Sequence, residues 1–169
     1  AAFFEIEAKN NTDKEMKFQI AFSVSNPSDS SYNNFVTKNG FKIINLNNNA
    51  VGKEDINYKE LSIATDSDIV YTQSYWYRGQ WQDRIVTFWN DFSTKEVINN
   101  RVYDTPGQYD TASIIAEINI LPQKSKSARF VLAWNAPNNY YHLANEEDAE
   151  ELKPWKNYYA TVFDSSEQT

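Results

Sequence analysis

The chain has 169 residues, no cysteine, one histidine and a formal net charge of −7. Its length predicts one domain, and the missing cysteines exclude disulfides, thiolate chemistry and Cys-type metal sites. The acidic balance argues against nucleic acid and anionic membranes as partners, and no apolar run approaches the ~18 residues of a transmembrane helix.

The first elements in chain order are two strands with period-two alternation of apolar and polar residues, at 4–9 and 16–25. Each alternation is typical of a half-buried strand. A polar turn, Asn10 to Lys14, separates the two segments. The pattern therefore predicts an antiparallel hairpin with a longer loop.

The rest of the chain contains further short strand patterns. Runs of β-branched and aromatic residues predict strands at 41–46, 61–65, 69–77, 85–89, 113–121 and 128–134, with a last strand or extended exit segment at 158–163. Residues 122–127 predict a second hairpin, and 90–97 and 145–152 carry weak helix signals. No alternation of strands with helices occurs. We therefore expect an all-β, antiparallel two-sheet sandwich with one or two short helices in the connections.

The acidic pairs and the single histidine are the candidate catalytic groups. Glu5 and Glu7 lie on the polar side of a strand pattern, and Asp66 and Asp68 lie in a turn. The acidic run 146–151 has the pattern of an exposed helix face. His142 is the single histidine, and the chain has no Gly-x-Ser-x-Gly motif that would supply a nucleophilic serine for it. None of these contexts demands catalysis, so we expect no catalytic residue, no metal and no cofactor.

The most unusual stretch is aromatic and runs from Tyr75 to Trp81. Such rings either fill a sandwich core, cover an interface with another domain, or stack on sugar rings. We keep these interpretations open. The candidate residues for a domain interface or for sugar contact are Trp76, Tyr77, Trp81, Trp89, Trp155 and Tyr158.

Several ordered motifs resemble one known family. Residues 128–137, ARFVLAWNAP, resemble the F-x-L-A-W-D-x-P signature of the N-terminal domain of glycoside hydrolase family 116, the bile-acid β-glucosidases or non-lysosomal glucosylceramidases. Residues 58–65 are similar to its G-x-M-A-L-A-T strand, 89–92 match its W-x-D-F motif, and 155–163 resemble its Y-T-x-x-F exit. The opening strand pair is similar as well. The chain departs from the signature at Asn135, where the family has Asp.

The resemblance implies a non-catalytic domain. In this family of retaining β-glucosidases, a C-terminal (α/α)6 domain carries the nucleophile and the acid/base, so no catalytic residue is transferred here. We expect residues 1–169 to form a single sandwich resembling the later part of the family's N-terminal domain, either excised or free-standing. Residues 138–169 would be a loop and an exit segment toward the catalytic domain, its expected partner.

Two other functions stay open. The first is a lectin-like module that binds carbohydrate through surface aromatics, and the second is an adhesion or assembly domain that uses exposed edge strands. The composition leaves the compartment open, with a slight preference for the cytoplasm because cysteine is absent.

Overall fold

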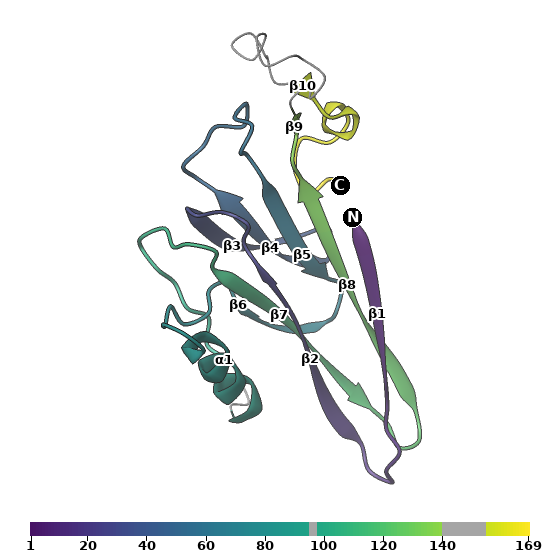
Figure 1. The fold of residues 1–169 in the computed structure, drawn as a ribbon. Helices are drawn as coiled ribbons and strands as arrows, with labels where there is room; N and C mark the ends of the chain where they lie inside the picture. The colour runs from purple at the N-terminus through teal and green to yellow at the C-terminus, as the bar shows by residue number, and fades with distance from the viewer. Residues whose placement is uncertain (95–97, 140–154) are drawn as a thin grey trace.

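The computed structural model describes residues 1–94, 98–139 and 155–169. Its two large antiparallel sheets pack face to face, and a third sheet consists of two short strands (Figure 1). Sheet A has the strand order β1-β8-β5-β4-β3, and sheet B has the order β2-β7-β6. The predicted antiparallel sandwich is confirmed. The elements are β1 (Ala2–Lys9), β2 (Met16–Ser25), β3 (Ser31–Lys38), β4 (Phe41–Asn48), β5 (Glu60–Thr65), β6 (Ile69–Gln73), α1 (Asp83–Thr94), β7 (Thr111–Ile120), β8 (Ser125–Asn135), β9 (Asn138–Asn139), β10 (Trp155–Lys156) and the 3₁₀ helix η2 (Tyr158–Thr161).

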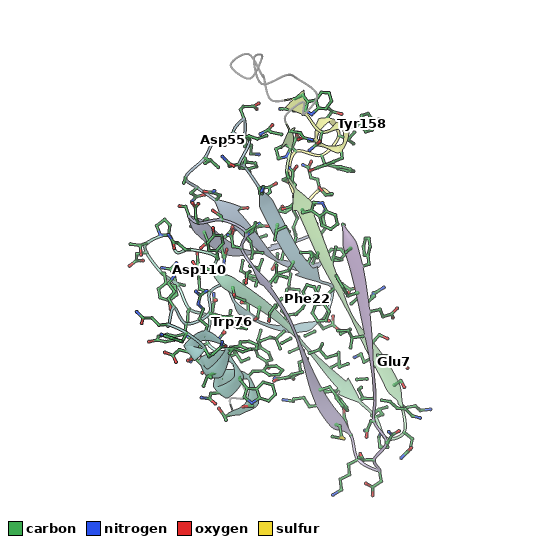
Figure 2. The ribbon with its side chains drawn as sticks, viewed as in Figure 1. Glu7, Phe22, Asp55, Trp76, Asp110 and Tyr158 are labelled. Atoms are coloured by element: carbon green, nitrogen blue, oxygen red, sulfur yellow. The ribbon has the colours of Figure 1, made fainter. Side chains whose placement is uncertain are left out.

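The hydrophobic core fills the space between the two sheets. Sheet A contributes Ile44, Ile63 and Phe130, and β7 contributes Ile114. All four are fully buried, and each such side chain stabilises the fold by roughly 1.5–3 kcal/mol. On the β1 side, the Phe22 ring lies between the rings of Phe4 and Phe130, at centroid distances of 5.0 and 5.3 Å. Figure 2 shows Phe22 pointing from β2 into this core.

Both predicted hairpins are wrong. β1 pairs with β8 in sheet A, and β2 pairs with β7 in sheet B, so each predicted turn is instead a crossover from one sheet to the other. Alternation identifies the apolar face of a strand but not its neighbour, and the apolar faces of β1 and β2 meet across the core. The crossovers lie together, because the Asn10 amide donates to the carbonyls of Lys14 and Ile120, at 2.6 and 2.9 Å.

Strand β3 was not predicted from the sequence. It forms a hairpin with β4 through Asn39 and Gly40, which have φ values of 51° and 85°. Asn-Gly is the preferred dipeptide of a two-residue hairpin turn because both positions need positive φ. This dipeptide was the signal that would have located the strand.

The strand predicted at 85–89 is wrong, since these residues lie in α1. Phe88 and Phe92, four residues apart, point to the same side of this helix and stack at 5.7 Å, and Phe88 packs with Ile115 on the outer face of sheet B. Packing on sheet B therefore overrides the β propensity of the run. The helix signal at 90–97 is confirmed for 90–94, while 95–97 lie outside the described residues.

The end of the chain also differs from the prediction. Residues 158–163 begin with η2 rather than a strand, and the strand predicted at 69–77 ends at Gln73. The helix predicted at 145–152 and His142 lie outside the described residues. Both chain ends lie on the β1–β8 side of the molecule in Figure 1, and Ala1 and Thr169 line the same hollow of about 290 Å³.

Candidate functional site

The aromatic stretch passes from the core to the surface within seven residues. Tyr75 is buried, and its hydroxyl oxygen accepts a hydrogen bond from the backbone N–H of Asn33 at 2.7 Å. Trp76 is half-buried, Tyr77 is partly exposed, and Trp81 is 95% exposed. Trp81 also has a φ of 55°, which is uncommon for a residue with a side chain. The predicted candidates therefore have different environments.

Trp76 is used inside the domain. Its ring stacks on Phe88 of α1 at a centroid distance of 4.3 Å and an interplanar angle of 9°. Its indole N–H donates to the Ser113 hydroxyl at 2.7 Å. Figure 2 shows Trp76 between α1 and the sheet. A sugar ring would have to compete with Phe88 for this indole.

A row of apolar side chains covers the outer side of α1. Ile85, Val86 and Trp89 are 53%, 54% and 60% exposed, and their spacing of one, three and four residues places them on one side of the helix. Trp81 precedes the helix by two residues. We call Trp81, Ile85, Val86 and Trp89 the helix surface. Phe88 and Phe92 face sheet B, and Ile85 and Trp89 lie next to them at helical spacing. One broad apolar side of α1 therefore runs from the contact with sheet B onto the exposed surface.

A buried ion pair holds the segment that precedes the helix surface. The Arg78 guanidinium donates through Nε and Nη2 to the two carboxylate oxygens of Asp110, at 3.0 and 2.8 Å. It lies 4.0 Å from the ring centroid of Tyr103 and donates to the Thr105 carbonyl at 2.9 Å. Asp110 is buried and also accepts from the Ser31 hydroxyl at 2.6 Å. Arg78 therefore binds the loop before β7, and Asp110 links that loop to Ser31 of β3, so the arrangement serves a structural role.

Trp155 and Tyr158, the other predicted candidates, lie at a different end of the molecule. Tyr158 is 85% exposed and belongs to η2, which Figure 2 shows far from Trp76. Trp155 lies in β10, which pairs with β9. The six predicted residues therefore do not form one site, because four lie at or beside α1 and two lie beyond the end of β8.

Glu60 is a buried carboxylate surrounded by uncharged donors. Its oxygens accept hydrogen bonds from the Tyr58 hydroxyl at 3.0 Å, the Asn135 amide at 3.3 Å and the backbone N–H of Ser166 at 2.6 Å. Burial, then the charge of Glu60 and the hydrogen bond to it, raise the pKa of Tyr58 from 10.0 to about 12. The Tyr58 hydroxyl therefore remains a donor to Glu60 through the neutral range. This cluster joins β5 and β8 to the C-terminal tail.

The C-terminal tail is also held to sheet A by Glu167. Its carboxylate accepts from the Lys38 ammonium at 2.9 Å and from the Asn45 amide at 2.5 Å. The hydrogen bond from Lys38, then that from Asn45, hold the pKa of Glu167 below its usual value of 4.5, although burial opposes them. The charged form of Glu167 is therefore favoured in the folded chain.

Replacing Glu167 with glutamine is expected to lower the free energy of unfolding by about 1 kcal/mol at pH 7. Because the folded pKa is depressed, this stabilisation is present above pH 4.5 and disappears as the pH falls through the folded pKa. Urea denaturation at several pH values measures the difference between wild type and variant. Glu54→Gln, which removes an exposed partner of Lys156, is the control and should change little. A difference for Glu167→Gln that grows in acid would contradict this account.

The other buried carboxylates have structural partners too. Asp91 pairs with Arg101 at 2.5 Å. Glu117 accepts from Gln19 at 3.0 Å and pairs with Lys17 at 3.4 Å. Burial acts to raise the pKa of Glu117, but the hydrogen bonds from Gln19 and Lys17 outweigh it and lower the pKa. Within the described residues, no three Asp, Glu or His side chains are grouped so that they could hold a metal ion.

Comparison with known proteins identifies the family. The model of the N-terminal domain of glycosyl-hydrolase family 116, described as beta-glucosidase 2, matches residues 1–169. The chain belongs to this family. The resemblance seen in the sequence is thereby confirmed over the whole chain. A comparison with curated proteins found no match. None of the described helices of this family 116 domain is long and apolar enough to span a membrane.

Sequence reasoning missed the two buried polar clusters of this family 116 N-terminal domain. Arg78 and Asp110 are 32 positions apart, and the groups around Glu60 come from positions as distant as Ser166. No local pattern marks such pairs. Only Asn135 gave a sequence signal for the Glu60 cluster, because it stands where the family signature has Asp. Its side-chain amide donates a hydrogen bond to Glu60.

Proposed function

We propose that this chain is a non-catalytic domain that supports the catalytic domain of a family 116 β-glucosidase by docking against it through the helix surface. The observation that carries the proposal is the exposure of the helix surface, because its four apolar side chains are each more than half exposed. Contiguous apolar surface of this kind marks protein interaction sites. The family match supplies the class of partner.

The environments of the buried acids support a non-catalytic role. Glycoside hydrolysis needs two carboxyl groups that face each other across the scissile bond, one with a raised pKa. Asp110 and Asp91 are held by arginines. Glu117 has a lowered pKa, the opposite of what a general acid needs. Glu60 accepts hydrogen bonds from Tyr58 just before β5, from Asn135 of β8 and from Ser166 of the C-terminal tail, so it serves to hold these segments together.

The helix surface has the composition of an interface centre. Tryptophan is enriched among the residues that dominate binding free energy, and such residues are surrounded by a polar rim. Trp81 and Trp89 would be the anchors, with Arg84 and Gln82 exposed beside them. The Trp89 ring also stands on an ordered support, because it packs on Phe92 at a centroid distance of 6.1 Å. Trp155 and Tyr158 form a second exposed group. We assign this group to the edge of the proposed contact with the catalytic domain, or to the surface outside that contact.

Replacing Trp81 and Trp89 with alanine together is expected to weaken the complex by at least ~30-fold, since one anchor contributes about 2 kcal/mol or more. The complex is formed by mixing this chain with a helical catalytic domain of a family 116 β-glucosidase and is measured by calorimetry. The melting temperature of the free variant should stay close to that of wild type, because both rings are exposed.

The matched control is Trp155→Ala, which removes an exposed tryptophan from the other end of the molecule. We expect it to weaken the complex by less than about threefold. If Trp155→Ala abolished binding and the helix-surface variant bound as wild type, the docking surface would have been assigned to the wrong end. If wild type failed to bind at all, the docking proposal would fail.

A further inference from the structure

A small polar hollow lies apart from the helix surface and from the buried clusters. It has a volume of about 190 Å³ and is lined by Pro27, Ser28, Asp29, Asn48, Asn57, Lys59 and Tyr109. The lining comes from three connections, those between β2 and β3, β4 and β5, and α1 and β7, and from the end of β4. The volume is below the roughly 300–1,000 Å³ of a pocket for a drug-sized ligand. It therefore suits one small ring.

Tyr109 is held above this hollow in a strained conformation. Its φ is 51°, in the left-handed region that side chains of this size rarely adopt. The conformation is fixed on both sides, because the Tyr109 N–H donates to the Ser28 carbonyl at 2.8 Å and the next residue, Asp110, is bound to Arg78. As a result Asp110 turns inward while the Tyr109 ring is 53% exposed. Strain held in this way is common at ligand sites.

The polar groups around Tyr109 have unused hydrogen-bonding capacity. Asn48 uses its Oδ1 to accept from the N–H of Ala50 at 2.8 Å, which fixes the amide and leaves its NH₂ group without a partner among the described residues. The side chains of Asp29, Asn57 and Lys59, which also line the hollow, make no hydrogen bond or ion pair to other described residues. The hollow thus offers amide donors and acceptors, one carboxylate, one ammonium and an aromatic face.

We propose that this hollow binds a single neutral sugar ring, a hexopyranose. Sugar hydroxyls are both donors and acceptors, so they match amides, a carboxylate and an ammonium together. The apolar face of the ring would lie against Tyr109, as aromatic rings favour. The Asp29 carboxylate and the Lys59 ammonium leave the lining without a net formal charge, which suits a ligand that carries no net charge. This site is independent of the docking proposed for the helix surface.

The test is a titration of the isotope-labelled chain with methyl β-D-glucopyranoside and methyl β-D-galactopyranoside, followed by amide chemical shifts. A ligand of about 13 non-hydrogen atoms on an open site should bind with a Kd of the order of 1 mM. We expect saturable shifts in residues 27–30, 48, 57–59 and 107–110 with at least one pyranoside. Glucuronate, which carries a negative charge, should bind more weakly.

Variants separate the contribution of the ring from that of the fold. Tyr109→Ala is expected to weaken binding about tenfold or more, whereas Tyr109→Phe keeps the ring and should stay within about threefold of wild type. Asn57→Ala should weaken binding, and Asn90→Ala, an exposed asparagine on α1, should not. Absence of saturable shifts with both pyranosides, shifts confined to α1, or wild-type affinity of Tyr109→Ala would each overturn the proposal.

Discussion

Replacing Arg78 with methionine is expected to lower the free energy of unfolding by about 3–5 kcal/mol, because the change leaves a buried carboxylate without its cation. Asp110 accepts two hydrogen bonds from Arg78, and its side chain is almost inaccessible to water. The variant also loses the contact of the guanidinium with the Tyr103 ring and its bond to the Thr105 carbonyl. Urea denaturation at neutral pH measures the effect.

The control for Arg78 is Lys156→Met, which removes an exposed ion pair with Glu54. Exposed pairs contribute about 0–1 kcal/mol, so this variant should unfold nearly as wild type does. A second variant, Arg78→Met with Asp110→Asn, removes the unpaired charge and should recover part of the lost stability. If Arg78→Met and Lys156→Met had the same small effect, the Arg78–Asp110 pair would not be the support that the structure indicates.

Replacing Asn135 with aspartate is expected to destabilise the domain by about 3–5 kcal/mol at pH 7, since it places a second carboxylate beside Glu60 inside the protein. The Asn135 amide now donates to Glu60 at 3.3 Å. Two carboxylates at this separation cannot both be ionised without a large penalty. On acidification one of them takes up a proton and can donate to the other.

The pH dependence of the Asn135→Asp variant follows from this proton. In the folded variant the two carboxyl groups hold a proton to higher pH than they do in the unfolded chain. The deficit in unfolding free energy relative to wild type is therefore smallest below about pH 4 and grows as the pH rises. Adding Glu60→Gln to Asn135→Asp restores an amide–carboxylate pair and should recover most of the loss. Asn49→Asp, in an exposed loop, is the control. A deficit that does not change between pH 4 and pH 7 would contradict this interpretation.

The sequence pattern, which is alternation at 16–25 and runs of β-branched and aromatic residues at 113–121 and 128–134, was enough to predict these strands and the sandwich class. It could not predict their neighbours, because the contact of Phe22 with Phe4 and Phe130 joins residues from three distant segments. It also misread 85–89, whose apolar residues fit a helix as well as a strand; packing on Ile115 decides between them. The Asn39-Gly40 turn, by contrast, was a local signal and was overlooked.

The candidate site was predictable only in part. The aromatic stretch at 75–81 was correctly identified as unusual, but no sequence pattern distinguishes Trp76, stacked on Phe88, from Trp81, which is exposed. That difference depends on where α1 begins and on how it lies on sheet B. The hollow at Tyr109 was equally hidden, because its lining comes from segments up to 82 positions apart, from Pro27 to Tyr109 (109 − 27 = 82).

The most direct test of the central claim measures hydrolysis of para-nitrophenyl β-D-glucoside by the purified chain, by a family 116 catalytic domain and by their mixture. The account predicts no turnover by the chain alone, and in the mixture a complex whose catalytic domain is more resistant to thermal inactivation. Turnover by the chain alone that a single carboxylate substitution such as Glu60→Gln abolishes would contradict it.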